Sequence, residues 1–172
     1  MRTEDDETFT EFVSAQQAGL LRLAVLLAGD RGHAEDLVQI ALMKAYRHWS
    51  RISRSGPPSA YVRRVLVTTH TSWRRRLSTT EQVMETLPDR ADPTAAPDEE
   101  DEELRRALRA LPPRMRSAVV LRYFEDLSEQ GTADLMGCSA STVNTQTARG
   151  LARLRTSLAG PAIYHPVRED QW

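Results

Sequence analysis

Residues 128–158 read SEQGTADLMGCSASTVNTQTARGLARLRTSL and predict two helices joined by a tight turn. Ser128 can cap a short helix, and Ser139 can cap a longer one that runs to about Leu158, because serine accepts backbone N–H groups at helix starts. Gly137 lies between them and suits the left-handed residue that ends many helices. The segment therefore predicts a helix-turn-helix.

The longer helix has two predicted faces. Apolar residues at helical spacing are expected to face inward, namely Val143, Leu151, Leu154 and Leu158. The other side carries small or hydrogen-bonding residues that suit a helix in the major groove: Ser141, Thr145, Ala148 and Arg149. A helical hairpin with a polar outer face is the alternative, but the basic residues along this helix favour DNA binding.

Charge is distributed unevenly along the 172 residues, although the net charge is only −1. Residues 1–80 carry 12 basic and 8 acidic side chains, and residues 104–160 carry 9 and 4. Residues 81–103 carry 1 basic and 10 acidic side chains. Two basic blocks around an acidic segment predict nucleic-acid contact at two places, against the alternative of surface charge scattered by chance.

The pattern of apolar residues predicts an all-α fold of two small helical domains. In the first domain, residues 1–80, helices are expected over 8–28, 34–49 and 59–76, with a turn at 29–32 and a loop over 53–59. Pro88, Pro93 and Pro97 lie among the acids of 81–103, which predicts a flexible linker. The helix-turn-helix domain follows over 104–160, and 161–172 form a tail.

The first basic block predicts contact with unpaired DNA. From Leu37 to Thr80 there are nine basic residues and no acid, with aromatic residues between them. Basic groups follow phosphates and aromatic rings can stack on unpaired bases. Tyr46, Trp49 and Trp73, however, lie on apolar stripes, so each is predicted to be a core residue.

Nothing in the sequence points to catalysis. Cys138 is the single cysteine, which excludes an internal disulfide and a multi-cysteine metal site. The four histidines are dispersed and no phosphate-binding loop occurs, so we predict no catalytic residue, no metal and no cofactor. The acidic N-terminus is no secretory signal and no apolar run could cross a bilayer, so we expect a cytoplasmic protein without membrane insertion.

Two motif blocks resemble the conserved regions of bacterial RNA polymerase sigma factors. Residues 34–39 (AEDLVQ) and 42–47 (LMKAYR) resemble region 2. Residues 111–114 (LPPR), 120–128 (VLRYFEDLS) and 137–139 (GCS), with Thr142-Val143, resemble region 4. The chain is similar over residues 9–158 to extracytoplasmic-function (ECF) sigma factors, most of all to their actinobacterial SigE-like branch.

The resemblance implies a non-enzymatic protein that binds core RNA polymerase and directs promoter-specific transcription initiation. Its region 2 would contact the polymerase through Asp36, Gln39, Leu42, Lys44 and Arg47. The same domain would open the −10 element and hold its strand through Arg63, Arg64, Thr68, Thr69, Ser72, Arg74, Arg75 and Arg76. Region 4 would read the −35 duplex through Ser141, Thr142, Asn144, Thr145, Gln146, Arg149 and Arg153.

Several alternatives stay open at this point. A DNA-binding repressor or activator would use the helix-turn-helix alone, and a polymerase-bound regulator would read no promoter. The acidic linker is either a DNA mimic that screens the basic faces or a solvated spacer. The tail is either a disordered end or a peptide that docks on the protein. The resemblance also implies an anti-sigma partner and a monomer or one-to-one complex.

Overall fold

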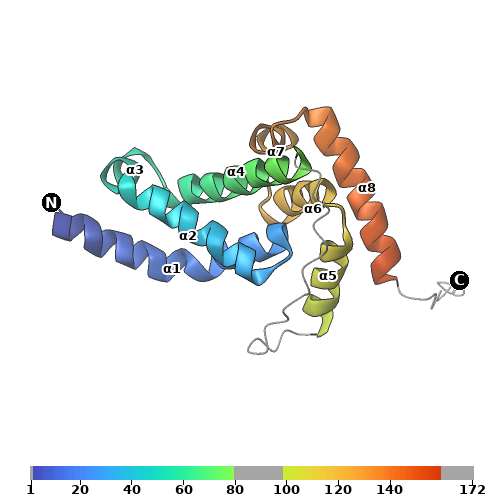
Figure 1. Ribbon diagram of the computed structural model, residues 1–172, viewed down its shortest axis with the longest axis horizontal. Coiled ribbons are helices and arrows are strands. Elements are labelled where there is room, and N and C mark those ends of the chain that lie inside the picture. Colours follow the sequence, from blue (N-terminus) through green and yellow to red (C-terminus); the bar gives the residue numbers. More distant parts are fainter. Residues whose placement is uncertain (1, 80–98, 160–172) are drawn as a thin grey trace, which may run out of the picture.

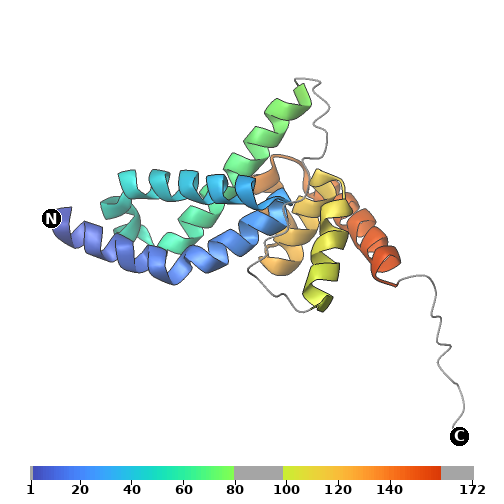
Figure 2. The same ribbon diagram turned by 60° about the horizontal axis from the view of Figure 1, so that its bottom comes forward.

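The structure, a computed structural model, describes residues 2–79 and 99–159, and within them all regular structure is helical (Figures 1 and 2). The all-α prediction is confirmed for this part of the chain. The helices form an N-terminal and a C-terminal bundle. Residues 81–98 of the predicted linker and the tail 161–172 lie outside the described residues.

The N-terminal bundle consists of four helices: α1 (Arg2–Ala28), α2 (Arg31–Arg47), α3 (Trp49–Ser55) and α4 (Pro58–Thr79). Helix α2 packs against both α1 and α4. The core between them is aliphatic, with Leu20, Leu27, Leu37 and Leu66 fully buried. Asp30 caps α2 because its carboxylate accepts a hydrogen bond from the His33 backbone N–H at 2.9 Å.

Several predicted boundaries in this bundle are wrong. Helix α1 begins at Arg2, well before the predicted residue 8. The predicted helix 34–49 ends at Arg47, and a further helix, α3, covers part of the predicted loop 53–59. The predicted turn 29–32 is confined to its first two residues, because the capping by Asp30 starts α2 at Arg31.

Two aromatic residues of the apolar stripes, Trp49 and Tyr46, differ in burial. Trp49 is buried as predicted, and its indole N–H donates to the Thr8 hydroxyl at 3.0 Å. Tyr46 is 51% exposed, so its prediction as a core residue is wrong. Its ring lies against Phe9 at 5.0 Å between centroids, and its hydroxyl donates to Asp6 at 2.8 Å. The polar end of the ring therefore stays at the surface.

The C-terminal bundle consists of α5 (Glu99–Ala110), α6 (Pro113–Val119), the short π-helix η1 (Val120–Phe124), α7 (Glu129–Met136) and α8 (Ala140–Leu158). Leu108, Leu121 and Val143 are fully buried in its core. The linker predicted over 81–103 is too long, because α5 begins at Glu99. Buried Leu108, with Leu111 directly after the helix, anchors α5 in the core.

Local geometry confirms the predicted helix-turn-helix. The Ser128 hydroxyl accepts a hydrogen bond from the Gly131 N–H at 2.9 Å, and the Ser139 hydroxyl accepts one from the Thr142 N–H at 3.1 Å. Gly137 adopts the left-handed conformation, with φ 65° and ψ 41°. Leu158, predicted to face inward, is exposed because it lies in the last turn of α8, where fewer neighbours cover the helix.

The two bundles pack against each other. Helix α4 contacts α7, and α1 contacts α5 and α6. Figures 1 and 2 show α7 beside the C-terminal half of α4, and α6 near the end of α1. The buried apolar side chains form one cluster that runs through both bundles. The bundles therefore share a core.

Candidate nucleic-acid interface

The first half of α8 presents a polar surface. Ser141, Asn144, Thr145 and Arg149 are exposed, and Thr142 and Gln146 are half-buried between them. The opposite side is fixed to the bundle through Val143, Thr147, Gly150 and Leu154, which are all buried. Because the buried side and both caps hold the helix in place, the exposed side chains form a rigid surface of the size that a major groove admits.

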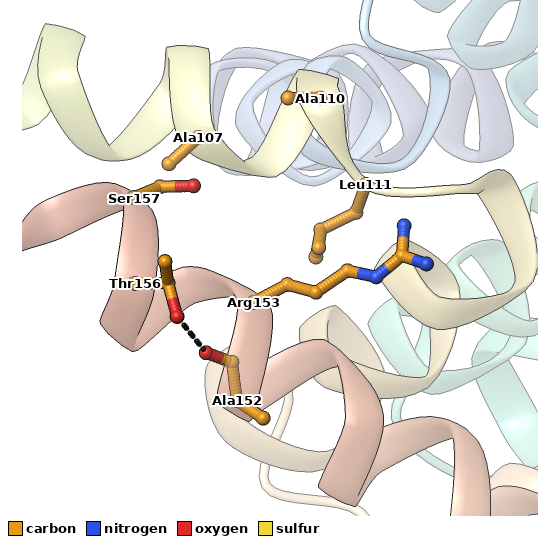
Figure 3. A pocket seen from close by; sticks show the side chains of 7 residues that line it. All are labelled: Ala107, Ala110, Leu111, Ala152, Arg153, Thr156 and Ser157. Carbon is orange, nitrogen blue, oxygen red and sulfur yellow. Dashed lines mark hydrogen bonds between the residues drawn. The ribbon is translucent and has the colours of Figure 1, made fainter.

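Arg153 lies apart from this surface. It lines a shallow groove of 360 Å³ between α5 and α8, together with Ala107, Ala110, Leu111, Ala152, Thr156 and Ser157. Figure 3 shows its side chain extended past Leu111, while the Thr156 hydroxyl bonds to the Ala152 carbonyl. Six of the seven predicted α8 residues thus lie together, and Arg153 lies on the groove instead.

Helix α4 divides its predicted DNA-binding residues between two sides. Arg64, Ser72, Arg75 and Arg76 are exposed, and Thr68 is half-buried next to them. Arg63 and Arg74 turn toward the C-terminal bundle, and the Thr69 hydroxyl is buried without a hydrogen-bond partner. Five of the eight residues therefore form an accessible polar row along α4, and the other three are directed inward.

Two of the α4 arginines bind the C-terminal bundle. Arg63 Nη1 donates to both carboxylate oxygens of Glu125, at 2.6 and 2.5 Å. Arg75 Nη2 donates to the carbonyl oxygens of Met136 and Gly137, at 3.3 and 3.1 Å. The turn of the helix-turn-helix thus lies directly on α4. A Cβ atom at Gly137 would lie 2.0 Å from Arg75 Nη2, so only glycine permits this approach.

A third arginine joins the bundles from the other side. Arg116 of α6 is only 5% exposed, and its Nε donates to the Leu27 carbonyl at 3.0 Å. Its two terminal nitrogens donate to the carbonyls of Arg109 and Ala28, at 3.3 and 3.5 Å. Arg116 therefore satisfies carbonyls at the end of α1 that the helix itself leaves unpaired.

The groups around this contact form a cluster of two histidines and two arginines, His33, His70, Arg74 and Arg116. Burial, reinforced by Arg74, His33 and Arg116, lowers the pKa of His70 to about 3. Burial, with Arg74 and Arg109 nearby, lowers the pKa of Arg116 to about 10, and burial also lowers the pKa of Arg74. Among the residues that the structure describes, neither ring nitrogen of His70 has a hydrogen-bond partner, which fits a neutral imidazole.

Trp73 belongs to the same region. It stacks on His33 with 3.8 Å between ring centroids, and the Arg74 guanidinium lies 6.0 Å from the indole. Trp73 is only half-buried and lies outside the hydrophobic core cluster of the described residues, so its prediction as a core residue is wrong.

The predicted polymerase-binding residues lie on the outer side of α2. Asp36, Gln39, Lys44 and Arg47 are exposed there, whereas Leu42 is half-buried and packs on the core. Two apolar residues that the polar pattern did not select, Ile40 and Met43, are also exposed, Met43 by 57%. The sequence could have indicated them, because they are apolar residues that lie outside the buried stripe of α2. An apolar centre with a charged rim is typical of protein interfaces.

Other kinds of site are not evident in the part of the chain that the structure describes. Among residues 2–79 and 99–159, no three His, Cys, Asp or Glu side chains are grouped so as to hold a metal ion. In the same residues, no helix is both long and apolar enough to cross a bilayer. Cys138 is a partly exposed free thiol in the turn.

Comparison with known proteins identifies both bundles. Residues 12–80 match the family "Sigma-70 region 2", and residues 101–154 match "Sigma-70, region 4". The RNA polymerase sigma-E factor of Streptomyces avermitilis is 40% identical over 151 residues, which cover 87% of this chain and 84% of that protein. The sigma-E factor of Streptomyces coelicolor is also 40% identical, over 87% of this chain and 85% of its own.

The fold agrees with a solved structure at lower sequence identity. The sigma factor RpoE of Bartonella quintana, in complex with the anti-sigma factor NepR, superimposes with a TM-score of 0.65. That match covers 91% of this chain and 99% of the other, at 22% identity. The family matches, the relatives and the two-bundle architecture agree, and the chain belongs to the ECF sigma factors, which direct transcription initiation through regions 2 and 4.

Proposed function

We propose that α8 reads the −35 element as duplex DNA and that α4 holds the separated strand of the −10 element. The observation that carries the proposal is the exposed polar side of α8, presented by two serine caps and a left-handed Gly137. Asn144 and Gln146 carry amides that can pair with adenine edges, and Arg149 can pair with guanine or phosphate. Arg64, Ser72 and Arg76 supply the accessible polar groups of α4.

The polymerase contact is proposed on the outer side of α2. The exposed pair Ile40 and Met43 would supply apolar contact area, and Asp36, Gln39, Lys44 and Arg47 the polar rim. The protein performs no chemistry in this scheme, as in the rest of its non-enzymatic family. We also propose that it acts in the cytoplasm, as a monomer or in a one-to-one complex with an anti-sigma protein.

In vitro transcription with core polymerase tests this function. Sheared genomic DNA serves as template, and the RNA 5′ ends are sequenced. We expect new start sites that share two upstream elements. Arg149→Ala and Thr145→Ala should each reduce initiation about 5- to 150-fold, since each loses contacts worth about 1–3 kcal/mol. The matched control is Thr156→Ala, an exposed residue of the same helix outside the polar surface.

The controls separate this function from its alternatives. A polymerase-bound regulator that reads no promoter would bind core but create no start sites. A repressor or activator that uses only the helix-turn-helix would not bind core. An unchanged start-site profile in the Arg149→Ala and Thr145→Ala variants would contradict the role of α8.

A further inference from the structure

The groove between α5 and α8 is not used by the proposed function. It has a volume of 360 Å³, at the lower end of the range for ligand pockets, so it suits one or two side chains of a peptide. Figure 3 shows Ala107 beside Ser157 at one end of the groove and Leu111 beside Arg153 at the other. The groove therefore runs along the last turns of α8, and its α5 side is apolar.

The described chain ends beside this groove. Ser157 lines one end of it, and Ala159 is the last residue that the structure describes. Pro161 follows, and a proline at this place opposes further helix and favours a change of direction. The next large side chains are Ile163 and Tyr164. An apolar segment therefore begins a few residues after the chain leaves an apolar groove.

We propose that residues 161–170 fold back along α8 and dock in this groove. Ile163 and Tyr164 lie against its apolar walls, and the acids Glu169 and Asp170 lie toward Arg153. The groove is thus an intramolecular site for the segment that follows α8. This inference rests on the groove and on the sequence after it, and not on the proposed function of α4 or α8.

The length of the segment suits this path. At about 1.5 Å per helical residue, Arg153 lies about 9 Å back along α8 from Ala159. Extended chain gains about 3.3 Å per residue, so Ile163 and Tyr164, which come soon after Ala159, reach the groove even after a turn. Because the segment is tethered next to its site, its effective concentration there is on the order of millimolar, and a weak contact suffices.

Charge favours an acidic occupant of the groove. Residues 104–160 carry 9 basic and 4 acidic side chains, whereas residues 161–170 carry 1 and 2. Within residues 2–79 and 99–159, no hydrogen bond or ion pair involves the Arg153 side chain, so the acids of the segment can approach it without displacing a partner. An exposed ion pair adds little stability, so the apolar contact of Ile163 and Tyr164 provides most of the attraction.

Disulfide formation locates the segment relative to the groove. Ala162→Cys is combined with Thr156→Cys, which lies in the groove, or with Arg155→Cys, an exposed neighbour outside it, in the whole chain with Cys138→Ser. A free segment would reach both positions alike, because they are adjacent in the chain. We expect the Thr156→Cys pair to close about tenfold faster, after correction for the reactivity of each single cysteine with a small disulfide.

Cleavage by chymotrypsin after Tyr164 measures how much of the time the segment is docked. Ser157→Glu puts a charge into the groove, and Ser141→Glu is the same change at an exposed position of α8 outside it. Mass spectrometry follows the release of residues 165–172. Because cleavage follows the undocked population, Ser157→Glu should speed it about five- to tenfold, and Ser141→Glu should leave it unchanged.

Either measurement can overturn the inference. Equal closure rates of the two cysteine pairs would show that the segment does not lie on the groove side of α8. Equal cleavage rates in the unchanged protein and in the Ser157→Glu protein would show that the groove does not hold the segment. In both cases the proposed reading of DNA by α8 would be unaffected, because transcription tests it separately.

Discussion

At the scale of single residues, the contact between the bundles depends on two glycines and the arginines beside them. Gly29 and Gly137 both have positive φ, and a Cβ atom at either one would meet an arginine that crosses the contact, Arg116 or Arg75. Glycine at these points permits both the helix end and the close approach. The sequence indicated the left-handed Gly137 but gave no sign of the arginine against it, because the partner lies 62 residues away.

Gly137→Ala should destabilise the protein by about 1–2 kcal/mol from the left-handed conformation alone, with a further loss from the contact with Arg75. Urea unfolding measures the change. The double variant Gly137→Ala/Arg75→Ala removes the clash but keeps the backbone strain. Gly137→Ala should therefore lower the free energy of unfolding less in the Arg75→Ala background than in the unchanged protein. An equally stable Gly137→Ala protein would show that the turn adopts another conformation.

The buried His70 predicts a dependence of stability on pH. Its pKa is about 3 in the folded protein and 6.5 ordinarily, so below pH 6.5 the unfolded chain binds a proton that the folded chain excludes. Stability should therefore be complete above pH 6.5 and fall by up to about 1.4 kcal/mol per pH unit toward pH 3. His33, whose pKa burial also lowers, adds to this slope.

The slope is measured by urea unfolding between pH 7 and pH 4.5. His70→Met, which cannot titrate, should reduce the slope, whereas Thr156→Ala, a change at an exposed position that involves no titratable group, should not. An identical slope in the His70→Met protein would mean that other groups produce the pH dependence.

At the scale of elements, the sequence predicted correctly those features that depend only on residues close to each other in the chain. The caps Ser128 and Ser139, the turn at Gly137 and the end of α8 are local, and all are confirmed. Tyr46 and Leu158 fit their apolar stripes yet lie at the surface, because a stripe cannot tell where the covering helix ends. The exposed pair Ile40 and Met43 and the ion pair of Arg63 with Glu125 depend on tertiary placement, which no local pattern contains.

The hydrogen bond at the Ser139 cap predicts how much this residue contributes to the stability of the protein. Ser139→Ala should cost about 1 kcal/mol of stability, since the Thr142 N–H loses its acceptor at the start of α8. Ser139→Asp should retain most of the stability, because aspartate can accept the same hydrogen bond and places a negative charge at the positive end of the helix dipole. Urea unfolding compares the two, and equal losses would contradict capping as the reason for serine at this position.

At the scale of the whole molecule, the shared core predicts that the two bundles unfold together. The buried apolar cluster runs through both, and Arg116 fixes α6 to the end of α1 through two hydrogen bonds to carbonyls of α1. Two independent probes are available in the chain. In a Trp172→Phe background, tryptophan fluorescence reports Trp49 and Trp73 of the N-terminal bundle, and the reactivity of Cys138 reports the C-terminal bundle.

The two unfolding curves in urea should coincide for this protein, which is the mark of a single cooperative unit. Arg116→Gln should separate them, because a glutamine amide is too short to reach the carbonyls of Leu27 and Ala28 together and the bundles then unfold singly. Arg114→Gln, the same substitution at an exposed position of α6, should leave the curves superimposed. Separate curves already in the unchanged protein would show that the buried cluster does not couple the bundles, and the packing of region 4 on α4 would then rest on the contacts of Arg63 and Arg75 alone.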